Sequence, residues 1–125
     1  MNETIARFNA LKWHDSKLLG LSFAREGTEE QVRLSLEMRG EQGTLVPMEM
    51  IFKGSTYIAL EVDLEGKHQC SNDISDARCC ASSEWTKMLS DRNPYDSFSG
   101  FLHFEIDLIP PGGNINILAK DFVTG

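Results

Sequence analysis

Alternation of apolar and polar side chains is the feature that most constrains what this chain can fold into. From Gln31 to Arg39 every second residue is apolar, and the residues between are polar or charged. Successive side chains of a strand point to opposite faces, so this segment is predicted to be a strand with one buried face. The same alternation predicts further strands over residues 17–25, 46–53, 57–64, 102–108 and 115–117.

Short connectors with turn residues separate these strands. Glycine supplies the positive φ that tight turns need, and it occurs in the links 26–29, 40–43, 53–55 and 110–114. Such links are too short for parallel crossovers, so antiparallel hairpins are predicted. Pro47 has no N–H to donate, so the strand over 46–53 is predicted to lie at an edge or to begin outside the sheet.

A helical pattern interrupts the strands in the second half of the chain. Apolar residues from Ile74 to Leu89 recur at spacings of three and four, which predicts a helix over Asp73–Ser90, capped by Asn72 or Asp73. A shorter helix is predicted before Trp13. We therefore expect one α+β domain over residues 1–125. Its antiparallel six-stranded sheet consists of a four-strand meander and a C-terminal hairpin, with the helix packed on one face.

Charge excludes some functions. The chain of 125 residues has a formal net charge of −7, and the acidic excess lies mainly in its second half. A negative surface repels phosphate backbones, so we expect no nucleic-acid partner. The charge suits a basic protein partner, or it serves solubility alone. With neither a signal-peptide pattern nor an apolar run long enough for a membrane span, we expect a cytoplasmic protein and no membrane partner.

Trp13, His14, Asp15 and Ser16 place the residue types of a hydrolase triad side by side. Neighbours on an extended chain point to opposite faces, whereas a catalytic triad is assembled from distant segments. We therefore expect no catalytic residue here. Trp13 is expected to pack beneath the sheet, and Asp15 and Ser16 to satisfy free backbone donors. His14 alone keeps a possible functional role.

A second group of polar residues lies on the strand over 102–108. His103, Glu105 and Asp107 share one strand face, roughly 7 Å apart. They suit metal binding, acid–base chemistry or simply a solvated face. If Glu61 and Asp63 lie nearby, an acidic docking patch is the stronger hypothesis. The candidate binding residues are therefore His14, Asp15, Glu61, Asp63, His103, Glu105 and Asp107.

The three cysteines are Cys70, Cys79 and Cys80. With His68 they resemble a fragment of a zinc site, but the spacing lacks the paired ligands of structural zinc sites. We therefore expect no metal and no cofactor. An odd number of cysteines favours reduced thiols, and the sequence leaves open whether any of the three is reactive.

The stretch from Trp13 to Leu18 resembles the opening W-H-D-[SA]-x-L of small uncharacterised bacterial proteins. The residues at 51–54 (I-F-x-G) and 111–117 (P-G-G-x-I-x-I) are similar to later parts of the same pattern. Some of those families are similar to immunity proteins, which bind and neutralise a cognate toxin. The resemblance implies a protein partner and no catalytic residues.

Three functions follow as hypotheses. The first is a non-enzymatic cytoplasmic protein-binding domain, immunity-like, whose acidic sheet face or helix docks onto a partner. The second is a small enzyme or ligand-binding domain with a polar site around His14, His103, Glu105 and Asp107. The third is a homo-oligomer that pairs an exposed strand edge.

Overall fold

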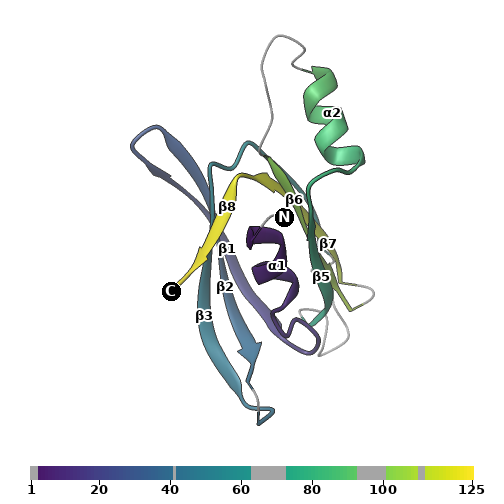
Figure 1. Ribbon diagram of the computed structural model, residues 1–125. Coiled ribbons are helices and arrows are strands. Elements are labelled where there is room, and N and C mark those ends of the chain that lie inside the picture. The colour runs from purple at the N-terminus through teal and green to yellow at the C-terminus, as the bar shows by residue number, and fades with distance from the viewer. Residues whose placement is uncertain (1–2, 41, 63–72, 93–100, 110–111) are drawn as a thin grey trace.

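The part of the chain that the structure describes forms two four-stranded antiparallel sheets and two helices (Figure 1). The computed structural model describes residues 3–40, 42–62, 73–92, 101–109 and 112–125. The first sheet has the order β1-β2-β3-β8, with strands β1 (Lys17–Glu26), β2 (Glu29–Arg39), β3 (Leu45–Lys53) and β8 (Asp121–Thr124). The second has the order β4-β7-β6-β5, with strands β4 (Tyr57–Val62), β5 (Ile74–Cys80), β6 (Leu102–Leu108) and β7 (Gly113–Ala119). The helices are α1 (Glu3–Asn9) and α2 (Glu84–Arg92).

The α+β class and the antiparallel pairing are confirmed, but the single six-stranded sheet is wrong. The chain changes sheet between β3 and β4, and it returns to the first sheet between β7 and β8. Alternation reveals that a segment is a strand but not which strand lies beside it, so the split into two sheets was not visible. Pro47 lies in the part of β3 that β8 does not reach, since β8 pairs only with Met50–Lys53.

The apolar faces of the two sheets meet around α1. Figure 1 shows this helix (purple) between β3 and β8 on one side and β5 on the other. Phe8 is fully buried, and its ring lies 5.0 Å from that of Phe104 in the second sheet and 5.3 Å from that of Phe122 in the first. Trp13 packs against Phe8 at 4.7 Å, as expected of a core residue. Burying one such ring contributes about 1.5–3 kcal/mol.

The helix predicted over Asp73–Ser90 is wrong in its first half. Ile74–Cys80 forms strand β5, and only Glu84–Arg92 is helical. A register shift between Ile74 and Asp76 places both Ile74 and Ala77 on the inner face. An irregularity of this kind turns a spacing of two into a spacing of three, which resembles the period of a helix. Asn72, the alternative cap, lies outside the described residues.

Ser83 caps the start of helix α2. The Ser83 hydroxyl accepts hydrogen bonds from the backbone N–H groups of Trp85 and Thr86, and the Thr86 hydroxyl accepts the N–H of Ser83. This reciprocal pair satisfies donors that the first turn of a helix leaves free. Neither helix of the described residues is long and apolar enough to cross a membrane.

Strand β1 also carries a register shift, between Leu18 and Gly20. As a result, Leu18 and Leu21 pack on the core, whereas Leu19 is 56% exposed. Strict alternation over 17–25 predicts a common face for Leu19, Leu21 and Phe23, and the register shift makes this wrong at Leu19. Phe23 pairs with the buried Val32, but it is 67% exposed near the tip of the β1–β2 hairpin.

A substitution at Gly113 tests how closely β4 and β7 pack in the second sheet. Its φ is +107°, and a Cβ there would lie 1.8 Å from the backbone oxygen of Glu61. We expect Gly113→Ala to lower the free energy of unfolding by about 3 kcal/mol or more, because the backbone of β4 would have to move. Gly43→Ala is the matched control. It has φ +79° but open space for a Cβ, so it should cost only about 1 kcal/mol. Equal losses in urea denaturation would contradict this reading.

Candidate functional site

The outer face of the second sheet carries a row of charged side chains. Antiparallel pairing places Asp76 opposite Asp107 and Arg78 opposite Glu105. Asn114 pairs with Asp107 on one side and with Glu61 on the other. Directly opposed residues share a face, so all of these side chains lie on the side of the sheet away from the core. We call this surface the acidic face and define it by Glu61, Asp76, Arg78, Glu105 and Asp107.

Arg78 is the centre of the acidic face. Its guanidinium lies 2.6 Å from a Glu105 oxygen, 3.2 Å from an Asp107 oxygen and 3.7 Å from an Asp76 oxygen. Partial burial by itself lowers the pKa of Arg78, but the carboxylates of Glu105 and then Asp107 outweigh it, so the pKa is raised. The guanidinium therefore stays charged and holds the carboxylates of two strands at fixed positions.

Negative charge remains in excess on this face. Three carboxylates lie around the Arg78 guanidinium, and Glu61 lies further across the same face on β4, which leaves a formal charge of −3 on the five residues. The Glu105 and Asp107 side chains are 22% and 31% exposed, whereas Asp76 is 68% exposed. Glu61 is also exposed. Asp76 and Glu61 are thus the groups most open to a partner. The candidate residue Asp63 lies outside the described residues.

His103 shares this sheet face but is only 5% exposed. Its Nε2 lies 2.7 Å from Oδ1 of Asn116, and the Trp85 ring of α2 lies 6.1 Å from its imidazole. Because an amide oxygen only accepts, Nε2 carries the proton of this hydrogen bond. His103 is therefore part of a buried polar pair and not of the exposed acidic face.

The Trp13–Ser16 stretch joins α1 to the start of both sheets. The Trp13 indole N–H donates to the Phe8 carbonyl at 2.9 Å. The fully buried Ser16 hydroxyl donates to the Lys12 carbonyl at 2.8 Å and accepts the N–H of Arg39 at 3.0 Å. The expected role of Ser16 at a free backbone donor is confirmed, and its hydroxyl has no capacity left for a catalytic base.

Asp15 and His14 lie at the surface of this junction. Asp15 adopts φ +67°, the one positive φ at a non-glycine residue in the described part of the chain, and aspartate tolerates this conformation better than most residues. Its carboxylate accepts a hydrogen bond from the Arg39 guanidinium at 2.9 Å. The His14 Nδ1 donates to the Ser75 carbonyl at 3.1 Å, which fixes the ring against β5.

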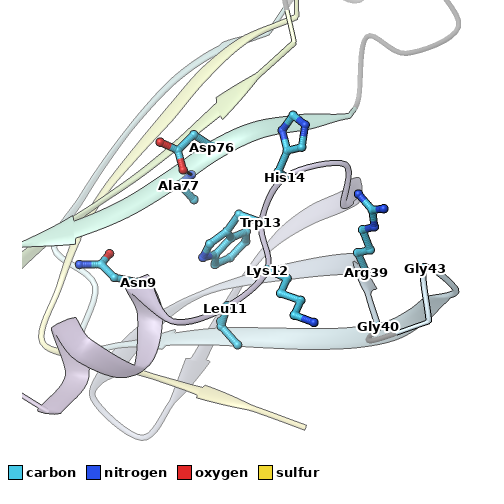
Figure 2. Close-up of a pocket in the computed structure, with 10 residues that line it drawn as sticks. All are labelled: Asn9, Leu11, Lys12, Trp13, His14, Arg39, Gly40, Gly43, Asp76 and Ala77. Carbon is cyan, nitrogen blue, oxygen red and sulfur yellow. Dashed lines mark hydrogen bonds between the residues drawn. The ribbon is translucent and has the colours of Figure 1, made fainter.

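A cleft of about 490 Å³ opens beside the junction (Figure 2). Its lining comes from the chain after α1, the turn between β2 and β3, and strand β5. Lys12, His14 and Arg39 contribute basic groups, but Asp76 also lines the cleft and Asp15 already pairs with Arg39. With opposite charges this close to balance, the cleft has no strong preference for an anion.

The polar site proposed around His14, His103, Glu105 and Asp107 is not brought together as one cluster. His14 contacts Ser75 near the start of β5, whereas His103 pairs with Cys80 at its end. Five residues of strand separate these points, or about 16 Å. Proton transfer between the two imidazoles would need hydrogen-bond reach or one bridging water. Among the described residues, no group of three or more His, Cys, Asp or Glu side chains is suited to hold a metal ion.

Sequence reasoning missed Asp76 and Arg78, because it placed both in a helix. The alternation of Asp76, Arg78 and Cys80 with Ala77 and Cys79 was the available signal. Comparison of the chain with protein-family models, with curated proteins and with solved structures found no match. The argument for function therefore depends on the geometry described above.

Substitutions within the Trp13–Ser16 stretch separate its structural residues from its exposed ones. We expect Ser16→Ala to lower the free energy of unfolding by about 1–3 kcal/mol, since it leaves the Arg39 N–H and the Lys12 carbonyl without their partner. His14→Ala should change it by no more than about 0.5 kcal/mol, because the imidazole is 72% exposed. Thermal or urea denaturation of both variants measures the difference. A greater loss for His14→Ala would contradict this assignment.

Proposed function

We propose that this protein is a non-enzymatic binding domain that docks a basic protein surface through its acidic face. The observation that carries the proposal is the position of four carboxylates on one side of the second sheet, three of them around Arg78 and the fourth, Glu61, on β4. A sheet is a rigid platform, so these charges keep their spacing when a partner approaches. Complementary charge accelerates encounter and selects the partner more than it adds affinity.

The role of Arg78 supports this proposal. Without a cation, carboxylates on neighbouring strands repel one another and favour other rotamers. Arg78 compensates Glu105 and Asp107, which are the less exposed pair, and leaves Asp76 and Glu61 to contact a partner. The partner chemistry that fits is a cluster of lysine and arginine side chains spaced across two to three strands, about 10–14 Å.

The class of partner that we propose is a toxin, with this protein as its cytoplasmic immunity protein. The W-H-D-S-x-L stretch supports this class, because it resembles families that include immunity-like proteins. Trp13 and Ser16 stabilise the fold through their hydrogen bonds. The W-H-D-S-x-L stretch therefore has a structural role, and the acidic face is the surface that we propose for binding.

Charge reversal tests the acidic face. The probe is a short oligoarginine peptide, and its binding is measured by calorimetry at about 0.15 M salt, where distant charges are screened. The double variant Glu61→Lys with Asp76→Lys should bind the peptide about tenfold more weakly, because like charges then meet at the contact. Glu61 makes no ion pair with Arg78 among the described residues, and the Asp76–Arg78 pair at 3.7 Å is the longest and most exposed of the three that Arg78 makes, so the fold should be retained.

The matched control is Glu3→Lys with Glu49→Lys. Both are exposed and lie outside the second sheet, on α1 and β3, and the pair changes the net charge by the same amount. Binding close to that of the original protein is expected for this control. Equal weakening by the two double variants would mean that net charge alone attracts the peptide, and the acidic face would be rejected.

Co-expression tests the immunity role separately. A toxic protein encoded beside the gene for this chain is expressed alone or together with it, and growth is measured. We expect rescue by the original chain and reduced rescue by Glu61→Lys with Asp76→Lys. Full rescue by that variant would reject the acidic face as the toxin contact. Absence of rescue by the original chain would reject the immunity role.

A further inference from the structure

Cys80, His103 and Asn116 lie side by side on three neighbouring strands of the second sheet. Cys80 on β5 is directly opposite His103 on β6, and both side chains are on the outer face. Directly opposed residues have Cβ atoms about 4.5–5.5 Å apart. Asn116 on β7 accepts the hydrogen bond from His103 Nε2 at 2.7 Å. A thiol, an imidazole and an amide in this order form a nucleophile, a base and a group that orients the base.

The protonation of His103 follows from this hydrogen bond. Nε2 carries the proton that it donates to Asn116, so in the neutral ring Nδ1 is an unprotonated acceptor. Nε2 is directed at Asn116 on β7, and the acceptor direction of Nδ1 points away from that of Nε2. Strand β5, which carries Cys80, lies on the side of β6 opposite to β7. Within the described part of the chain, the hydrogen bond from Nε2 to Asn116 is the one that the His103 side chain makes.

The two adjacent cysteines differ in environment. Cys79 points into the core, where burial first and the neighbouring Cys80 second raise the pKa of its thiol to about 12. Cys80 points outward, is half-buried and lies directly opposite His103, whose ring contacts that of Trp85. A thiol reacts as its thiolate, so Cys79 is unreactive near neutral pH. It serves as an internal comparison for Cys80 in the same molecule.

We propose that Cys80 is a thiol-modification site at which His103, oriented by Asn116, accepts the thiol proton, and that it takes small carbon electrophiles. In the reaction with iodoacetamide as probe, the sulfur forms a bond to the methylene carbon and the carbon–iodine bond breaks. Iodide leaves with the bonding electrons, and the thiol proton moves to Nδ1. The proton transfer requires a rotation about χ1 of Cys80 that brings the sulfur toward Nδ1. This proposal does not depend on the acidic face or on any protein partner.

The charged and titratable groups around this pair are few. Glu105 and Arg78 form the next row of the sheet and compensate each other at 2.6 Å. On the other side, Tyr57 of β4 lies beyond Leu118, and Arg92 of α2 lies over the Tyr57 ring at 5.6 Å. His103 is the base that strand pairing places directly opposite Cys80.

Alkylation rates measured at each cysteine test the proposal. The folded protein is treated with iodoacetamide at pH about 7 and about 10, and fragment mass spectrometry of the peptide after Arg78 distinguishes Cys79 from Cys80. The variant His103→Gln keeps a side-chain N–H for Asn116 but removes the base. We expect it to lower the Cys80 rate about tenfold at pH 7. At pH 10, where a free thiol ionises without help, the rate should recover to within about twofold.

Two outcomes would overturn the proposal. One is a Cys80 rate at pH 7 that His103→Gln leaves unchanged. The other is a rise in the rates of Cys79 and Cys80 together, which would mean that His103 only holds the sheet closed. If His103→Gln fails to fold, the original protein decides alone. Its Cys80 rate should rise less between pH 7 and pH 10 than that of glutathione, and an equal rise would reject the role of His103.

Discussion

The contact on which the rest of the structure depends is the packing of Phe8 between the two sheets. Phe8 meets Phe104 from the second sheet and Phe52 and Phe122 from the first, with ring centroids 5.0–6.3 Å apart. Tilted and edge-to-face arrangements of this kind contribute more than area burial alone. A short helix thus supplies a fully buried aromatic ring that contacts both sheets, and the sheets close around it. The relative placement of every outer face follows from this closure.

Polar contacts from the same segment protect the edge of the second sheet. The Asn9 amide accepts the N–H of Cys79 at 2.8 Å and donates to its carbonyl at 3.2 Å, so it replaces a neighbouring strand. Further along, the backbone of Asp15 and Ser16 pairs with both backbone groups of Ile74. A free edge of β5 would be open to pairing with other chains. Fixing this edge also fixes β5 and with it Asp76, Arg78 and Cys80, which belong to the two proposed sites.

The two sites use the same sheet surface for different purposes. Toward the start of β5 the side chains are charged and open to solvent, which suits contact with a protein surface. Toward its end, Trp85 of α2 lies next to His103 and excludes water from the imidazole. Burial makes a hydrogen bond there electrostatically stronger than at the exposed end. The position of α2 just after β5 creates this difference along a single strand.

The sequence by itself determined six of the eight strands among the described residues, the short N-terminal helix, the turn glycines and the shared face of His103, Glu105 and Asp107. Each of these depends on local periodicity or local backbone chemistry, which any stretch of chain carries with it. Only the tertiary structure decided that the strands form two sheets, that Ile74–Cys80 is a strand, and that Arg78 and Cys80 lie beside Glu105 and His103. Register shifts in β1 and β5 disguise the alternation locally, and strand pairing depends on contacts between residues far apart in the chain. Local patterns contain no information about such partners, so the acidic face and the cysteine–histidine pair appear only when the sheets are assembled.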